Sequence, residues 1–574
     1  MKLETKWYEK AKDTESLLTE YPRPSLVRGN YYSLNGYWDY GITKDYEKPK
    51  RSLGKIKVPF SPETRLSKVE RPLAEDECLW YWRNLTEANK EKGKRCILHF
   101  EAVDQFALVF LNGKAIKAHV GGYSPFAVEI TEELAAGNFL EVMVRDLGAS
   151  SYLARGKQSK ESKGMFYTGQ SGIWQSVWLE FVPDHYIEEV TFLPNYDKKE
   201  VEIKVKSEFI TPYRVKIDGK EYYGRSNEKQ TIRLQNDFHP WSPNSPYLYQ
   251  VEVILEEDVI KTYFALRKVH SGLDDKGIRR VYLNNEPIFL KGVLNQGYWP
   301  EGLYTPPCDE AYVADIKLMK ELGFNLMRMH AKVEARRFYY HCDQLGMLVW
   351  QDIVSGGEKH KSWYVTYFAT AMELLNKRIK DNHYGLTGRK SEEAKNRYYV
   401  ELKETINDLK FYPSIIVWSL FNEGWGQFDA IKIEKYARYL DDTRLIEVAS
   451  GWFDQGNGDF RSIHNYFFPL KLRKEKRIIA LSEFGGGSFS IKGHRTKKRT
   501  YGYRRYFSKK AMTKGYEKLM EREIIANIDK GLAVSIYTQL SDIEEEVNGI
   551  ITYDRRVIKI CEEMIKFINA RLTF

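Results

Sequence analysis

The stretch Ile415-Ile-Val-Trp-Ser-Leu-Phe-Asn-Glu-Gly424 decides the fold, because an apolar run of strand length ends abruptly in two polar residues. The same pattern returns in Arg477-Ile-Ile-Ala-Leu-Ser-Glu-Phe-Gly-Gly-Gly487. Short continuous apolar runs of this kind are typical of strands that are buried on both faces of a parallel sheet. Each run therefore predicts a buried strand that carries one carboxylate, Glu423 or Glu483, at its C-terminal end.

Further apolar runs surround these two and alternate with helical patterns. The candidate strands are 288–293, 324–330, 347–352, 414–422, 443–450, 461–466, 477–483 and 532–538. Amphipathic stretches lie at Glu310–Leu322 and Glu334–Leu345, and Gly323 and Gly346 follow them, as glycine often follows a helix. Eight such units in roughly 300 residues predict a (β/α)8 TIM barrel. The segment 353–413 exceeds one crossover and predicts additional helices or a lid.

The residues before the barrel predict two β domains. Within 1–183, the apolar run Phe106–Leu111 ends in Asn112-Gly113, a strong hairpin signal. Several short strands with Gly and Pro turns favour a β jelly roll here. Residues 184–272 continue with short alternating strands and predict a small immunoglobulin-like β-sandwich. The catalytic-type (β/α)8 barrel is then expected over 273–574.

Composition limits the class of protein. The 574 residues are 43% hydrophobic and 29% charged, which is an ordinary globular balance. Aromatic residues reach 14%, which fits both strand formation and stacking on sugar faces. The net charge of +10 is modest for this length and predicts no nucleic-acid partner.

The cysteines and the N-terminus bear on location. The five cysteines are widely spaced without a CxxC pair, which argues against a disulfide framework and a zinc site. The sequence starts without an apolar leader, and no apolar run approaches the roughly 18 residues of a membrane span. We therefore expect a reduced cytoplasmic protein without a membrane partner, although a removed leader would leave the same sequence.

The ends of the eight candidate strands carry polar or aromatic residues. In a TIM barrel these C-terminal ends meet at one face, which holds the active site. The residues predicted to contact substrate there are Asn422, His330, Asp352, Trp425, His464, Tyr466, Trp299, Tyr537, Gln539 and Glu546.

Alternatives exist for some of these residues. His330 and His464 could be packed structural histidines or metal ligands, but without HxH or HExxH spacing we predict no metal and no cofactor. Asp352 could bind a sugar hydroxyl or orient Arg328. Glu546 belongs to the run Glu544–Glu546, which could also be a solvated acidic loop.

Two carboxylates that face each other across a barrel mouth are what glycosidic bond cleavage requires. We expect Glu483 to be the nucleophile and Glu423 the general acid/base of a retaining mechanism. Asn422 could then hydrogen-bond the sugar 2-hydroxyl, and Tyr466 could donate to the nucleophile and keep it ionised. The pKa of Glu423 is expected to rise for acid catalysis and to fall once Glu483 is esterified.

Taken together, these motifs resemble glycoside hydrolase family 2 over nearly the whole chain. In the β domains the similar segments are Leu34-Asn-Gly-Tyr-Trp38, Tyr81-Trp-Arg83, Phe110-Leu-Asn-Gly113, Gly169-Gln-Ser-Gly-Ile-Trp-Gln175 and Phe264-Ala-Leu-Arg267. In the barrel they are Lys291-Gly292, Arg328-Met-His330, Phe421-Asn-Glu-Gly424 and Ser482-Glu-Phe-Gly485. The resemblance implies the same roles for Glu423 and Glu483.

The departures from the family concern the substrate. Asn295-Gln-Gly-Tyr-Trp299 stands where many β-galactosidases of the family have a His-Glu-His-type run that serves a metal. The Asn-x-Lys with which β-glucuronidases hold the sugar carboxylate does not occur in the barrel sequence. The basic stretch 492–510 follows the nucleophile strand, and its Lys492 or Arg495 could serve an acidic sugar instead.

The sequence thus predicts a retaining, exo-acting β-glycosidase that is β-galactosidase-like and acts on an oligosaccharide or other glycoside. A hydrolase of acidic sugars, a non-catalytic carbohydrate-binding relic, a β-domain scaffold that binds polyanions and a metal-dependent hydrolase are the alternatives. Relatives of the resembled family often form dimers or tetramers, so a homo-oligomer is also an expectation.

Overall fold

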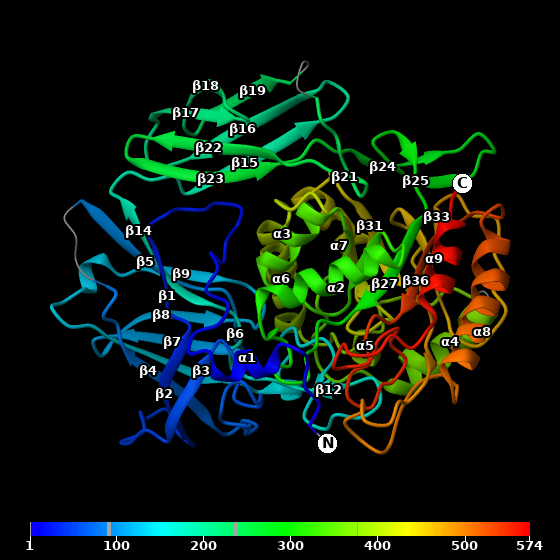
Figure 1. The fold of residues 1–574 in the computed structure, drawn as a ribbon, viewed down its shortest axis with the longest axis horizontal. Coiled ribbons are helices and arrows are strands. Elements are labelled where there is room, and N and C mark those ends of the chain that lie inside the picture. The colour runs from blue at the N-terminus through cyan, green and yellow to red at the C-terminus, as the bar shows by residue number, and fades with distance from the viewer. Residues whose placement is uncertain (1, 89–92, 235–237, 376) are drawn as a thin grey trace.

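The computed structural model describes residues 2–88, 93–234, 238–375 and 377–574. Figure 1 shows three bodies, with a β domain and an immunoglobulin-like sandwich packed beside a barrel of strands and helices. The eight-stranded barrel, the jelly-roll-like domain and the sandwich confirm the predicted fold class. The borders predicted at residues 183 and 272 stay predictions.

The N-terminal β domain consists mainly of two sheets. The first has the order β1-β14-β5-β9 and the second the order β3-β2-β4-β10-β7-β8. Their bounds are β1 Tyr31–Ser33, β2 Gly36–Thr43, β3 Gly54–Val58, β4 Cys78–Asn84, β5 Lys94–Phe100, β7 Phe106–Leu111, β8 Lys114–Val120, β9 Phe126–Glu129, β10 Phe139–Arg145 and β14 Val177–Pro183. The hairpin predicted at Asn112-Gly113 joins β7 to β8, and both residues have positive φ, as such a turn requires.

Shorter elements accompany these sheets. They are helix α1 Tyr8–Asp13 and strands β6 Val103–Asp104, β11 Gln158–Ser159, β12 Tyr167–Thr168 and β13 Gly172–Ile173. The segment 155–168, within which β11 pairs with β12, matters for the site because it contacts the barrel. Arg155 illustrates the attachment, since its backbone and side chain donate to the carbonyls of Ser355 and Gly357.

The immunoglobulin-like sandwich packs sheet β15-β16-β19 on sheet β18-β17-β22-β23. The bounds are β15 Glu189–Asn195, β16 Glu200–Lys206, β17 Pro212–Ile217, β18 Lys220–Arg225, β19 Lys229–Arg233, β22 Tyr249–Leu255 and β23 Asp258–Phe264. Alternating buried residues of β16 and β22 form its core. The buried Arg28 joins this sandwich to the N-terminal domain, because its guanidinium binds Asp258 and Glu180 at 2.7–2.8 Å.

The barrel strands form one parallel sheet in the order β31-β30-β29-β28-β27-β36-β33-β32. Their bounds are β27 Leu290–Asn295, β28 Leu326–Met329, β29 Leu348–Asp352, β30 Ile415–Asn422, β31 Leu445–Ser450, β32 Phe460–Asn465, β33 Ile478–Gly485 and β36 Leu532–Thr538. All eight predicted strands are therefore confirmed, with ends shifted by a few residues. The seam between β31 and β32 lacks a ladder among the described residues, but Gly451 N–H donates to Ser462 Oγ there at 3.3 Å.

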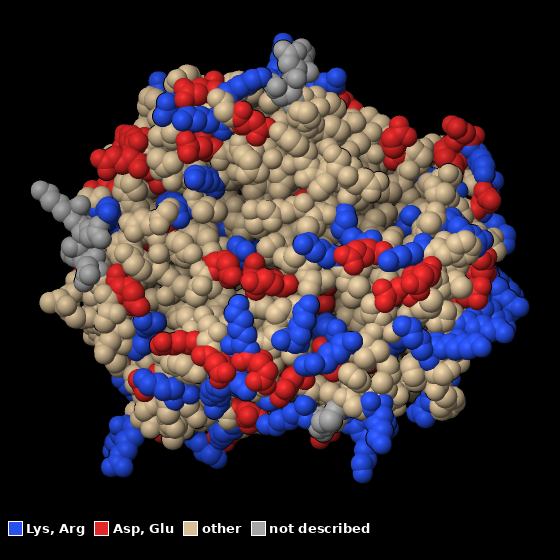
Figure 2. Space-filling view, viewed as in Figure 1, with Lys and Arg blue, Asp and Glu red and all other residues tan. Residues whose placement is uncertain are grey.

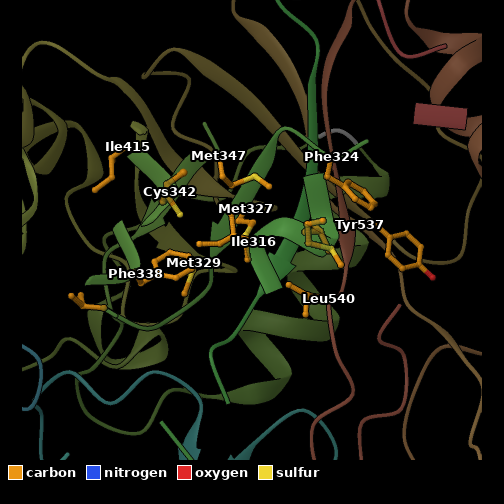
Figure 3. Close-up of a cluster of buried hydrophobic side chains, with 14 of the residues drawn as sticks. Ile316, Phe324, Met327, Met329, Phe338, Cys342, Met347, Ile415, Tyr537 and Leu540 are labelled. Atoms are coloured by element: carbon orange, nitrogen blue, oxygen red, sulfur yellow. The ribbon is translucent and has the colours of Figure 1, made fainter. Parts of the chain in front are cut away.

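Helices cover the outside of the barrel. They are α2 Asp309–Glu321, α3 Arg336–Leu345, α6 Glu392–Leu409, α7 Ala430–Leu440, α8 Lys509–Leu519 and α9 Glu562–Ala570. Both predicted amphipathic helices, α2 and α3, are present, and Gly323 and Gly346 adopt left-handed φ values just after them. Figure 3 shows how Ile316, Phe338 and Cys342 of these helices pack against Met327 and Met329 of β28.

The segment 353–413 carries the additional helices that its length predicted. A π-helical turn Trp363–Phe368 leads into α4 Ala369–Leu374, and α5 Tyr384–Thr387 precedes α6. At the opposite end of the barrel, strands β24 Val269–Leu273, β25 Arg279–Leu283 and β26 Glu286–Pro287 form a small sheet. Its side chains Val281 and Leu283 join the apolar cluster at that end.

Two observations bear on the chain as a whole. The five cysteines are all free thiols. Within the described residues, the helices are all too short or too polar to cross a bilayer.

Candidate active site

Glu423 stands directly after β30 in an unusual backbone conformation. Its φ is +53°, which costs a non-glycine residue about 1–3 kcal/mol. Its N–H donates to the carbonyl of Ser450 at 2.9 Å, which fixes the turn to the end of β31. Gly424 follows with φ +73°, and a Cβ there would lie 2.5 Å from the ring of Phe453. The turn therefore presents the Glu423 carboxylate at the mouth of the barrel.

Glu483 lies within β33, and its neighbour across the ladder is His464 of β32. The side chain is largely buried, at 6% exposure. His464 Nδ1 lies 2.9 Å from Glu423 Oε1, and its Nε2 lies 2.9 Å from Ser450 Oγ. The imidazole of His464 thus links β32 to the ends of β30 and β31.

A buried arginine forms the floor of the site. The guanidinium of Arg328 in β28 binds both oxygens of Asp352 at 3.0 Å. It also donates to Asn422 Oδ1 at 2.9 Å and to the Ser482 carbonyl at 3.0 Å. The second oxygen of Asp352 lies 2.6 Å from His330 Nδ1. This geometry favours the interpretation that Asp352 orients Arg328 over the alternative that it binds a sugar hydroxyl. Arg328 in turn orients the Asn422 amide.

Charges around Glu483 hold it in the ionised form. Burial alone would raise its pKa, but the positive charges of His464, His330, Lys157 and Arg328 outweigh burial and lower it. Burial also lowers the pKa of His330 itself. A carboxylate that stays ionised beside cations is suited to nucleophilic attack.

Tyr466 stands between the two carboxylates. Its hydroxyl donates to Glu423 Oε1 at 3.4 Å. Burial and the charge of Glu483 raise the pKa of Tyr466 well above its usual value, so the hydroxyl remains a donor. Its ring stacks on Tyr503 with centroids 4.2 Å apart. The hydrogen bond of this hydroxyl thus goes to Glu423, and the predicted contact of Tyr466 with Glu483 stays a prediction.

Aromatic side chains surround the carboxylates. Trp425 is tilted against Phe166 of the N-terminal domain, with centroids 5.6 Å apart, and stacks with His360. Trp452 lies edge-on to His464 at 5.8 Å. The sequence predicted Trp425 in this region, but not the contribution of Phe166.

Glu546 and Gln539 lie in a second polar cluster beside the carboxylates. Tyr167 donates to Glu546, and Asn548 donates to it at 2.9 Å. Gln296 donates to Gln539 Oε1 and to the Tyr167 hydroxyl, each at 2.6 Å. Burial raises the pKa of Glu546. The acidic run is therefore not a solvated loop at this position.

Two predicted residues are placed elsewhere. The ring of Tyr537 contacts Phe484 and Tyr516, in the layer between strands and helices that Figure 3 shows, rather than in the barrel mouth. Trp299 packs edge-on to Trp7, 6.1 Å away, under the guanidinium of Arg555. Both side chains belong to the apolar core. At a buried strand or loop end, a bulky side chain can pack against the core as readily as it can line a binding site.

Lys157 of the N-terminal domain was not predicted. It is 5% exposed, and its ammonium has neither a hydrogen bond nor an ion pair within the part of the chain that the structure describes. It lies about 6.0 Å above the ring of Tyr167, and its charge lowers the pKa of Glu483 and opposes the rise at Glu546. The sequence offered no signal for it, since it sits in an irregular loop far from the barrel in the chain.

Family models match the chain in three consecutive parts. Residues 53–175 match "Glycosyl hydrolase 2 galactose-binding domain-like", residues 185–267 "Glycosyl hydrolases family 2", and residues 276–472 "Glycosyl hydrolases family 2, TIM barrel domain". The chain belongs to glycoside hydrolase family 2.

Relatives within glycoside hydrolase family 2 carry different names. A β-galactosidase of Thermoanaerobacter pseudethanolicus is 26% identical over 72% of this chain and 55% of its own length. A putative β-glucuronidase of Formosa agariphila is 25% identical over 71% of this chain and 50% of its own length. The chain thus spans about half the length of the curated relatives it matches.

Solved structures of this family share the fold. A β-D-glucuronidase from Dictyoglomus thermophilum superposes with a TM-score of 0.71 at 17% identity, covering 96% of this chain and 98% of that one. A β-galacturonidase of family 2 from Eisenbergiella tayi, bound to galacturonate, also gives a TM-score of 0.71, at 18% identity, with coverage of 96% and 99%. At this identity the likeness concerns the fold.

The basic stretch 492–510 contributes tyrosines rather than cations to the described site. Tyr501 and Tyr503 have pKa values raised by burial and by the charges of Glu483 and Glu423. Lys492 is exposed, and Arg495 donates to Ser490 Oγ at 3.3 Å. No contact joins either cation to a catalytic candidate in the described part of the chain.

Proposed function

We propose that this protein is a retaining, exo-acting β-glycosidase with Glu483 as nucleophile and Glu423 as acid/base. One observation carries the proposal. The two carboxylates stand at the ends of β30 and β33 in different surroundings: the Glu423 carboxylate contacts His464 and the Tyr466 hydroxyl, whereas positive charges around Glu483 lower its pKa. Unequal environments of this kind separate the two roles in a carboxylate pair.

The reaction would proceed in two balanced steps. Glu483 attacks the anomeric carbon while Glu423 gives its proton to the leaving oxygen, so that an ester forms and the glycosidic bond breaks. Glu423, now ionised, takes a proton from water, and the resulting hydroxyl attacks the anomeric carbon and releases Glu483. Asn422, held by Arg328, is in position for the sugar 2-hydroxyl.

For the sugar, we propose a β-galactosidase-like preference, which the first of the relatives above supports. The closing aromatic side chains, Trp425 and Trp452, support attack on a terminal residue. A panel of aryl glycosides tests the proposal: β-galactoside, β-glucuronide, β-galacturonide, β-mannoside, β-glucoside, α-L-arabinoside and β-galactofuranoside. We expect one of them to be hydrolysed by the wild type and not by Glu483→Ala.

Retention is tested separately. Proton NMR of the first-formed product should show the anomeric configuration of the substrate. A 2-deoxy-2-fluoro glycoside of the same sugar should add its mass to the peptide that contains Glu483. Inverted product, or a label on another residue, would contradict the mechanism.

A second candidate is a hydrolase of acidic sugars, and Lys157 favours it. A buried ammonium that makes neither a hydrogen bond nor an ion pair with the described residues, and whose charge lowers the pKa of Glu483, is suited to the carboxylate of a uronic acid. If it has this role, Lys157→Met lowers kcat/KM for the uronides of the panel far more than for the neutral glycosides. Equal losses for both classes would reject it.

A further inference from the structure

A groove next to the candidate active site has a cationic lining. It has a volume of about 570 Å³ and lies between the segment 163–166 of the N-terminal domain and the segment 498–505 that follows the nucleophile strand. Its cations are Lys163, Lys498, Arg499 and Arg505. The groove therefore combines segments that are far apart in the sequence.

These four cations are exposed and uncommitted. None of their side chains takes part in a hydrogen bond or ion pair with the residues that the structure describes. The one acidic residue of the lining, Glu545, is already engaged, because it accepts from the Gly164 N–H and pairs with Lys497 at 3.4 Å. The groove thus has a surplus of positive charge without internal compensation.

The surplus is local. Figure 2 shows Lys and Arg mixed with Asp and Glu over most of the visible face, with Lys and Arg prevailing at the edge where Figure 1 draws α8. Helix α8 is the first helix after the segment 498–505. Because charged residues of both signs are mixed over most of this face, solubility does not require four uncompensated cations around one groove.

Aromatic rings connect the groove to Glu423. Tyr501 lines the groove, and its ring lies 5.9 Å from that of Tyr503. Tyr503 stacks on Tyr466, whose hydroxyl lies 3.4 Å from Glu423. On the other wall, Phe166 of the groove contacts Trp425, two residues beyond Glu423. The groove therefore opens on the side of the acid/base, where the leaving group departs.

We propose that this groove binds the leaving-group portion of the substrate, and that this portion is an anionic sugar residue bearing a carboxylate or a sulfate. The inference rests on the proposed function, because it takes Glu423 as the acid that protonates the leaving oxygen. Tyr501 and Phe166 supply faces on which a sugar ring stacks, while Arg499 and Arg505 supply donors that match planar anions. The terminal sugar that is cleaved off need not itself be charged.

The test compares three disaccharides that share the terminal sugar identified by the aryl panel. Their second residue is glucose, glucuronic acid or glucose 6-sulfate. We expect kcat/KM at low ionic strength to be at least about fivefold higher for an anionic partner than for glucose, as two exposed ion pairs allow. The ratio should decline as salt is raised, because exposed charges are screened. A preference for the glucuronic acid disaccharide alone would indicate a carboxylate site, and a preference for the glucose 6-sulfate disaccharide alone would indicate a sulfate site.

The variant Arg499→Ala/Arg505→Ala should bring the ratio close to one, with hydrolysis of the small aryl glycoside within twofold of wild type. A matched control is Arg51→Ala/Arg233→Ala, which removes two exposed arginines from the β domains and should leave the ratio unchanged. Absence of a preference in the wild type, or the same preference in the groove variant, would overturn the inference.

Binding separates this inference from the proposed function. Calorimetry with the Glu483→Ala protein measures the affinity of the same three disaccharides without turnover. Tighter binding of the anionic disaccharides that disappears in the groove variant supports the groove even if no aryl glycoside is hydrolysed. Equal binding of all three rejects it even if hydrolysis is found.

Discussion

His464 and Glu423 are joined by a contact of 2.9 Å between Nδ1 and Oε1, and the other ring nitrogen of His464 lies 2.9 Å from Ser450 Oγ. The imidazole is therefore fixed at both ends. Its ring contacts the proposed acid/base directly. We expect it to position the Glu423 carboxylate for proton transfer.

Replacing His464 by Gln should lower kcat for a glycoside with a poor leaving group, because proton donation then depends on a less well-oriented Glu423. KM should change little, and hydrolysis of a glycoside with an activated leaving group should be affected less. Steady-state kinetics with both substrates, and the alkaline limb of the pH profile, measure this. The exposed His185 provides a matched control, His185→Gln. Equal losses on both substrates would indicate a merely structural histidine.

The two carboxylates should respond differently to the leaving group. In Glu423→Gln, hydrolysis of a poor leaving group should fall by about 10²–10⁴-fold, the usual contribution of general acid catalysis. An activated aryl glycoside should still form the ester, seen as a burst of released phenol. Glu483→Gln should abolish turnover of both substrates and show no burst. A burst in Glu483→Gln would reverse the assignment.

Arg328 should be required for stability. Its guanidinium is fully buried and bound by Asp352, Asn422 and a backbone carbonyl. Arg328→Met leaves Asp352 buried without its main partner, which typically costs about 3–5 kcal/mol. In urea unfolding followed by tryptophan fluorescence, the barrel of the variant should unfold at a lower urea concentration than that of the wild type. The exposed Arg233→Met serves as control, and a shift equal to that control would contradict this role.

Acid should destabilise the barrel through Glu483 and Asp352. Burial opposes ionisation of both, but neighbouring cations lower the pKa of Asp352 to about 2 and the pKa of Glu483 to about 2. Because the folded pKa values lie below the unfolded ones, the stabilisation is complete above about pH 4.5 and is lost as the pH falls towards 2. Urea midpoints between pH 5 and 3 should decline less steeply in Glu483→Gln than in the wild type. If the urea midpoints of both proteins declined equally between pH 5 and 3, this prediction would be wrong.

The sequence predicted the barrel well because its strands are buried on both faces. Runs such as Ile415–Asn422 and Ile478–Gly485 are buried at every residue and mostly apolar, and their polar ends are conspicuous. Because both faces of these strands are buried, the sequence does not show which side chains face the barrel interior and which face the helices. A strand without alternation gives no period from which Tyr537 could be assigned to the helix layer rather than to the barrel mouth.

Contacts across domains were beyond sequence reasoning for a different reason. Lys157 and Tyr167 lie in irregular segments or two-residue strands, where neither period nor spacing carries information. Their contacts with the barrel come from the docking of two domains, which depends on many small surfaces such as the Arg155 contacts with Ser355 and Gly357. Within the segment 492–510, charge alone predicted a role for Lys492 or Arg495 at the sugar, whereas Tyr501 and Tyr503 are the residues whose pKa values respond to the carboxylates.

The placement of Lys157 and Phe166 on the N-terminal domain has a consequence for how such enzymes diversify. The N-terminal domain carries neither of the proposed catalytic carboxylates, Glu423 and Glu483, but supplies part of the wall around them. Substitutions in its 155–168 segment can therefore alter what is accepted while leaving the bond-breaking residues untouched. A barrel grafted onto a foreign N-terminal domain would keep its chemistry and inherit the selectivity of its new neighbour.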